Sequence, residues 1–213
     1  MGDRAIRPAA ALIAAREGAR GPEVLVLRRA GAHRFLPGYV VFPGGAVDPG
    51  DAELAERWFG RPGEAARACA VRELLEEAGL ALTAAGLRPA GDLGAVDAAP
   101  PRVGDLREVS RWVAPEHVPV RFDARFFAVR AEDGVEPGAA SPEVAEAWWA
   151  RPADLLEGWS ASRVLLYWPT MKLLEGLAGS RSVAELLATW VPQREPVGGE
   201  EEAMPRSTFS QEA

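Results

Sequence analysis

Short clusters of hydrophobic residues, separated by segments rich in glycine and proline, recur along the chain. Runs of apolar and β-branched residues predict strands at residues 23–29, 39–42, 86–94, 108–113 and 121–130. The apolar run at residues 9–15 fits either a strand or a helix. Helical spacing predicts helices at residues 64–78, 152–157, 170–177 and 182–190, with end signals at Gly79 and Ser182. Strands and helices interleave in a mixed order, which predicts an α/β fold.

Polar and turn-forming segments divide these elements. Residues 30–38, 97–104 and 132–142 contain glycine, proline or both, and we interpret them as connections. From Pro192 the chain is polar and includes an acidic run, so we expect residues 192–213 to be a disordered tail. One domain over residues 8–191, with C-terminal helices at about 168–190, fits a chain of this length.

Composition excludes several classes of protein. The 213 residues are 48% hydrophobic with a net charge of −7, which supports a sizeable core and argues against nonspecific nucleic-acid binding. A single cysteine, Cys69, excludes an internal disulfide, and its alanine neighbours favour a small buried residue. His33 and His117 stand alone, so no zinc site is expected. Without a long apolar run or a signal-peptide pattern, we expect a cytoplasmic protein.

Three glutamates on the predicted helix 64–78 suggest chemistry. Glu73, Glu76 and Glu77 are spaced i, i+3 and i+4, so they share one helical face. Like charges at this spacing repel by a few tenths of a kcal/mol per pair. A divalent cation would turn that repulsion into a binding site, since Mg²⁺ prefers oxygen ligands and substrate phosphate. The simpler alternative is a solvated acidic face, which many Glu-rich helices have.

The residues around these glutamates form a longer pattern. It comprises the turn Phe42-Pro43-Gly44-Gly45, then Glu64, then seven residues and the run Arg72-Glu73-Leu74-Leu75-Glu76-Glu77-Ala78-Gly79-Leu80. This resembles the signature box of the Nudix hydrolases, which cleave a diphosphate linked to another group. The resemblance implies an α/β/α sandwich with a mixed β-sheet, and it favours a strand at residues 9–15.

One departure from the box concerns spacing. The usual pattern has five residues between the glycine and the first glutamate, whereas eighteen lie between Gly45 and Glu64. The additional stretch, residues 46–63, begins with a turn signal, continues with a short helical pattern and ends in Gly60-Arg61-Pro62-Gly63. We expect a surface loop with one or two helical turns that leaves the following helix intact and can be shortened.

A second motif suggests the substrate. Arg29, four residues, Arg34, three residues, Gly38 and three residues precede the Phe-Pro-Gly-Gly turn. This spacing resembles the coenzyme A motif of one Nudix branch, although Leu25-Val26-Leu27 stands where Leu-Leu-Thr is usual. Arginine forks bind phosphate oxygens, and coenzyme A carries a diphosphate and a 3′-phosphate. The alternative is that these are ordinary surface arginines. Together the resemblances cover about residues 8–180.

The family resemblance also implies roles for these residues. Glu73, Glu76 and Glu77 would hold Mg²⁺ or Mn²⁺, and a carboxylate of the set would activate a water for attack on phosphorus. Glu64 would pair with Arg72 and orient the helix. The two box glycines, Gly44 and Gly45, would let the loop pack against the site and bind substrate. A further carboxylate is expected from a later loop, with Glu143 and Glu146 as candidates and a solvated charge as the alternative.

These implications define an expected function. The chain would hydrolyse coenzyme A or acyl-coenzyme A to 3′,5′-ADP and (acyl-)4′-phosphopantetheine. One alternative is hydrolysis of ADP-ribose, a dinucleotide or a nucleoside triphosphate. Another is a non-catalytic nucleotide-sensing module, which the loss of a box carboxylate would indicate, and none is lost here. The expected partner is a small-molecule diphosphate, with no nucleic acid and no membrane, and a homodimer is left open.

Overall fold

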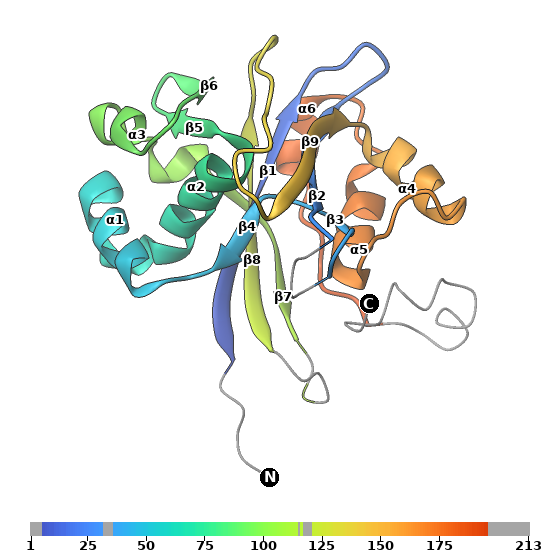
Figure 1. Cartoon of the computed structure of the whole chain (residues 1–213), viewed down its shortest axis with the longest axis horizontal. Coiled ribbons are helices and arrows are strands. Elements are labelled where there is room, and N and C mark those ends of the chain that lie inside the picture. The colour runs from blue at the N-terminus through green and yellow to red at the C-terminus, as the bar shows by residue number, and fades with distance from the viewer. Residues whose placement is uncertain (1–5, 32–35, 115, 117–120, 196–213) are drawn as a thin grey trace.

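The computed structural model describes residues 6–31, 36–114, 116 and 121–195. Within these ranges a seven-stranded mixed sheet has the order β3-β2-β1-β8-β7, with β4 also paired to β1 and β9 to β2 (Figure 1). Its strands are β1 (Arg7–Arg16), β2 (Glu23–Arg29), β3 (Val40–Val41), β4 (Gly44–Ala46), β7 (Arg107–Val113), β8 (Phe122–Arg130) and β9 (Val144–Ala150). The expected α/β fold is confirmed, and β2, β3, β7 and β8 match predicted strands.

Strand β1 lies at the centre of this sheet. It pairs in parallel with β8 and antiparallel with β2 and β4. Leu12 and Ala14 enter one hydrophobic core, whereas Ile13 and Ala15 enter the core on the opposite face. Burial on both faces explains why residues 9–15 read as a continuous apolar run rather than an alternating one. The strand that the family resemblance favoured is therefore confirmed.

Helices cover both faces of the sheet, as expected for an α/β/α sandwich (Figure 1). One core involves α1, α2 and the two-stranded sheet β5–β6, and the other involves α4, α5 and α6. The remaining bounds are α1 (Pro49–Phe59), η1 (Pro62–Glu64), α2 (Ala65–Ala78), β5 (Leu80–Thr83), β6 (Gly86–Pro89), α3 (Gly94–Ala98), η2 (Val103–Asp105), α4 (Pro152–Ser160), α5 (Trp168–Leu177) and α6 (Val183–Ala188). The four predicted helices correspond to α2, α4, α5 and α6.

The stretch at residues 46–63 is not the surface loop that we expected. It contains the eleven-residue helix α1, which starts with Pro49 and ends at Gly60 in the left-handed conformation. Its inner face buries Ala55 and Trp58, and the Trp58 indole donates a hydrogen bond to Asp97 Oδ1 in α3 at 2.7 Å. The expectation was wrong because the turn signal before this segment is the start of a packed amphipathic helix.

Strand β9 was also missed by the sequence patterns, which placed its residues in a loop. It pairs antiparallel with β2, and the register shifts where Arg28 faces Glu146 and Arg29 faces Val144. The shift breaks the simple alternation of apolar and polar positions that marks a strand. Short strands β4 and β5 were missed as well.

The C-terminal part of the chain follows the edge of the sheet. Ser182 caps α6, as predicted, by accepting a hydrogen bond from the Glu185 N–H at 3.2 Å. Beyond α6, the Val191 N–H donates to Val109 O on β7 at 2.8 Å, and the Gln193 side chain bonds both backbone groups of Val113. Most of the expected tail, residues 196–213, lies outside the described residues. In the described ranges, no helix has the length and apolar character needed to cross a membrane.

Candidate active site

Helix α2 carries the glutamate triplet and begins close to where the sequence predicted. Its first residue is Ala65, with Glu64 at the N-cap, and it ends at Gly79, which has φ 66° and donates its N–H to Leu75 O at 2.9 Å. Glycine adopts this left-handed conformation without steric cost, so the stop at Gly79 is confirmed. The helix packs one face on β1 and leaves Glu76 exposed.

The two box glycines bring the β3–β4 turn against this helix. The Gly44 N–H donates to Glu77 Oε2 at 2.9 Å, and a side chain at Gly44 would collide with the backbone of β1. A Cβ at Gly45 would collide with the Glu73 carboxylate. Both glycines are therefore needed for close approach, and they bring the turn to Glu73 and Glu77.

Burial changes the protonation of these two carboxyl groups. It raises the pKa of Glu77 to about 7, although the hydrogen bond from the Gly44 N–H opposes that change, and the nearby charge of Glu73 raises the pKa further. Burial likewise raises the pKa of Glu73, against the lowering effect of Arg72. A proton or a cation would stabilise this arrangement, in which the charge of the half-buried Glu73 disfavours the charge of the buried Glu77.

Arg72 has a different partner from the one expected. Its guanidinium donates to both oxygens of Asp51 on α1, from Nε at 2.8 Å and from Nη2 at 3.0 Å. Its Nη1 donates to Glu73 at 2.8 Å and to Glu76 at 2.9 Å. Glu64 instead pairs with Arg67, one turn further along the same helix. The expected pairing of Glu64 with Arg72 is therefore wrong, because α1 places a buried carboxylate closer to the guanidinium.

Of the two candidate loop carboxylates, Glu143 is the one that acts electrostatically on the glutamate helix. The charge of Glu143 raises the pKa of Glu77, and its carbonyl accepts the Ala30 N–H at 2.8 Å. The loop before it is anchored on the end of α2, since the Ala140 N–H donates to Glu77 O at 3.1 Å. Glu146 faces Arg28 across β2 and β9, with a 3.4 Å contact.

The pleat of β2 separates Arg29 of the second motif from its neighbour Arg28. Arg29 follows Leu25 and Leu27 toward the core that α2 covers, and its charge lowers the pKa of Glu77. Arg28 points to the other face, where its guanidinium lies 5.3 Å from the centre of the Trp148 ring. Arg34, like His33 and His117, lies outside the described residues. The structure thus brings Arg29 to the box glutamates.

Carboxylate oxygens fit a hard divalent cation, but the three glutamates are not gathered around one point. In the part of the chain that the structure describes, no three Asp, Glu, His or Cys side chains form a group that could hold a metal ion. Glu73 and Glu76 are both bonded to Arg72, and Glu76 is exposed. Mg²⁺ commonly uses one or two protein carboxylates together with substrate phosphate. The pair Glu73 and Glu77 satisfies that requirement.

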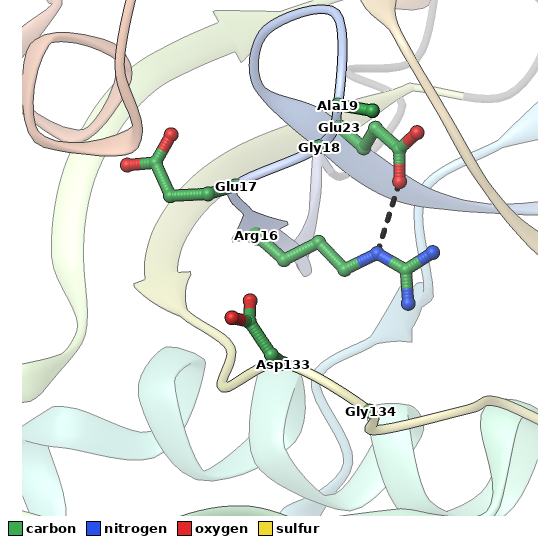
Figure 2. A pocket seen from close by; sticks show the side chains of 7 residues that line it. All are labelled: Arg16, Glu17, Gly18, Ala19, Glu23, Asp133 and Gly134. Atoms are coloured by element: carbon green, nitrogen blue, oxygen red, sulfur yellow. Dashed lines mark hydrogen bonds and ion pairs between the residues drawn. The ribbon is translucent and has the colours of Figure 1, made fainter.

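Two other features near or outside this site do not add reactive groups to it. Cys69 is buried, its pKa is raised by burial, and its thiol faces Gly45 O and Ala46 O. It is therefore a packing residue, as expected, rather than a nucleophile. A pocket of about 260 Å³ lies between the β1–β2 turn and the loop after β8, and within it Arg16 donates to Glu23 at 2.9 Å. Figure 2 shows the side chains that line it. No box residue lines it.

Comparison with known proteins identifies the family. The NUDIX domain model matches residues 5–168. "Putative nudix hydrolase 7" of Caenorhabditis elegans is 29% identical over 169 residues, which are 71% of this chain and 53% of that protein, so the chain spans about half the length of this relative. The crystal structure of a NUDIX hydrolase from Alicyclobacillus acidocaldarius has 33% identity and a TM-score of 0.73, covering 89% of this chain and 99% of that one. The chain therefore belongs to the NUDIX domain family.

Proposed function

We propose that this protein is a Nudix hydrolase that cleaves the diphosphate of coenzyme A or acyl-coenzyme A, giving 3′,5′-ADP and (acyl-)4′-phosphopantetheine. The observation that carries the proposal is the position of Arg29, which acts electrostatically on Glu77 while lying in the coenzyme A-like motif. A phosphate bound by Arg29 would lie beside the box carboxylates. The carboxylates that bind the cation and the diphosphate that is cleaved would then lie next to each other.

Glu73 and Glu77 are the proposed metal ligands, with Glu76 as a third that becomes available when it leaves Arg72. Nudix hydrolases generally use divalent metal ions, and either Mg²⁺ or Mn²⁺ suits this oxygen-donor pair. When bound, such a cation offsets charge on the diphosphate oxygens and promotes ionisation of water. It also relieves the mutual repulsion that contributes to the raised pKa of Glu77.

The remaining side chains would position the reactants and accept a proton. A water oxygen forms a bond to one phosphorus, the bridging P–O bond breaks, and the water proton passes to a carboxylate. Glu143 is a suitable acceptor because it lies within electrostatic range of Glu77 on a loop anchored to α2. Gly44 and Gly45 leave room for the turn beside the substrate, and Arg29 would bind a phosphate through charge-assisted hydrogen bonds.

A product assay tests this substrate. The protein would be incubated with Mg²⁺ or Mn²⁺ and with coenzyme A, 3′-dephospho-coenzyme A, ADP-ribose or a dinucleotide, and the products separated by chromatography. We expect coenzyme A to be cleaved most efficiently and its 3′-dephospho form more slowly. Faster turnover of ADP-ribose would contradict the coenzyme A assignment and leave a general diphosphate hydrolase.

Two adjacent arginines provide a matched control for that assay. Arg29→Ala should lower kcat/KM for coenzyme A by about tenfold to a hundredfold, the loss expected for one charge-assisted phosphate contact. Arg28→Ala removes the same charge from the opposite face of β2, so its effect should stay within about twofold. Equal losses in the two variants would mean that general positive charge, rather than the position of Arg29, attracts the substrate.

A further inference from the structure

The hydrogen bonds of Arg72 divide its guanidinium into two parts. Nε and Nη2 form a bidentate pair with Asp51, and Nη1 is shared by Glu73 and Glu76. A guanidinium is a rigid planar fork, so fixing two of its nitrogens also fixes the direction of the third. The position of Asp51 therefore determines how Arg72 approaches two glutamates of the box.

Asp51 is built into the structure for this contact. Asp51 lies near the start of α1 and is only 1% exposed. Its Oδ2 also accepts a hydrogen bond from the Asp48 N–H at 2.8 Å. The Asp51 hydrogen bonds raise the pKa of Arg72. A buried carboxylate without partners is strongly destabilising, so the pair holds α1 against α2 as well as orienting Arg72.

The spacing along the chain agrees with this geometry. Five residues, 46–50, separate Gly45 from Asp51, which is the separation between the glycine and the first acidic residue in the usual box. Glu64 has the usual seven-residue separation from Arg72 but not the usual separation from Gly45, and it forms an ion pair with Arg67. The additional residues thus follow Asp51 and form the rest of α1 and η1 (Figure 1).

We propose that Asp51, supplied by helix α1, is the positioning residue that keeps Arg72 from capturing the metal-binding carboxylates. The assignment rests on the proposed metal site at Glu73 and Glu77. With Asp51 present, the charge of Arg72 is balanced and a single nitrogen reaches Glu73. Without it, the Nε–Nη2 fork is free to bind Glu73 bidentately, and an unbalanced positive charge opposes a cation beside it.

Direct Mn²⁺ binding in the absence of substrate tests the proposal. Free Mn²⁺ would be measured by electron paramagnetic resonance for the intact protein and for Asp51→Asn, Glu64→Gln and Glu53→Gln, the last an exposed control on the same helix. Asp51→Asn should weaken binding by about tenfold or more, the range known for outer-shell partners of metal ligands. The two glutamate variants should stay within about twofold.

The outcomes separate this assignment from the proposed function. If the intact protein binds no Mn²⁺, the proposed metal site is wrong. If it binds Mn²⁺ and Asp51→Asn binds equally well, or if the loss appears in Glu64→Gln instead, the positioning role of Asp51 is overturned. Circular dichroism on each variant shows whether a loss of binding reflects a loss of fold.

A double variant tests whether Asp51 acts through Arg72. In Asp51→Asn/Arg72→Gln the unbalanced charge and the free fork are both gone, so Mn²⁺ affinity should recover most of the tenfold loss. Persistence of the full loss would overturn the mechanism. If Asp51→Asn alone is unfolded but the double variant folds, the unpaired buried charge of Arg72 causes the unfolding, which supports the role of Asp51 as the partner of Arg72. If both are unfolded, α1 acts by packing alone and the proposal is wrong.

Discussion

The two helical layers of the sandwich both bury charge, but in different ways (Figure 1). In the α4–α6 layer, Lys172 is 6% exposed and is satisfied within α5, by Glu175 at 2.9 Å and by the Trp168 ring at 4.4 Å. In the α1–α3 layer, Asp51 and Glu77 are buried by contacts that come from other segments of the chain.

The difference teaches how to tell a functional cluster from a buried structural charge. The buried Lys172 of the α4–α6 layer contacts two residues of its own helix, Glu175 and Trp168. In the α1–α3 layer, charged groups from α1, α2 and β2 act on one another beside the β3–β4 turn. Burial there raises the pKa of Glu77 to about 7. Convergence of this kind is costly for stability and is typical of a reaction site.

The largest expected effect is on stability, and it compares one core residue from each layer. Leu173→Ala in α5 should cost about 2–5 kcal/mol of unfolding free energy while leaving kcat/KM within about twofold. Trp58→Ala in α1 should cost about 3–5 kcal/mol and also reduce activity, because α1 carries Asp51. Urea unfolding and steady-state kinetics on both variants measure this. Unchanged activity in Trp58→Ala would remove the distinction between the layers.

The second expected effect is on catalysis. Glu77→Gln should lower kcat/KM by about a hundredfold or more, because it removes a proposed ligand charge. The fold should persist, since glutamine can still accept the Gly44 N–H and the variant no longer buries a charge. Glu175→Gln, on the other layer, is the control and should keep its activity. Comparable rates for Glu77→Gln and the intact protein at saturating Mg²⁺ would refute the assignment.

The smallest expected effect concerns pH and the salt bridge between β7 and β8. The hydrogen bond with Arg125 lowers the pKa of Glu108, so the bridge stabilises the fold above the unfolded-state pKa of about 4.3. That stability is lost as the pH falls through the lower folded-state pKa. Glu108→Gln should therefore cost up to about 1 kcal/mol at pH 7 and less at pH 2. Urea unfolding of both proteins at pH 7 and pH 2 measures this loss of unfolding free energy. An equal loss at the two pH values would mean that the substitution acts through packing rather than charge.

The fold was largely predictable because strong patterns coincide with deep burial. Residues 23–29 and 121–130 are read as strands from their own composition, and Gly79 ends its helix because the left-handed conformation favours glycine. Strand β9 and the packing of helix α1 into the core were missed for physical reasons. A register shift disturbs the pattern of β9, and the burial of α1 depends on contacts with α2 and α3 that the local sequence does not reveal.

For the site, the sequence by itself determined which groups are present and which share a helical face. The spacing of Glu73, Glu76 and Glu77 follows from helix periodicity, and the glycine pair marks a turn that must pack closely. Only the tertiary structure decided the partners. It paired Arg72 with Asp51 rather than Glu64 and brought Arg29 and Glu143 to Glu77. Long-range pairing depends on how α1, β2 and β9 pack around α2, and local residue patterns carry no information about that packing.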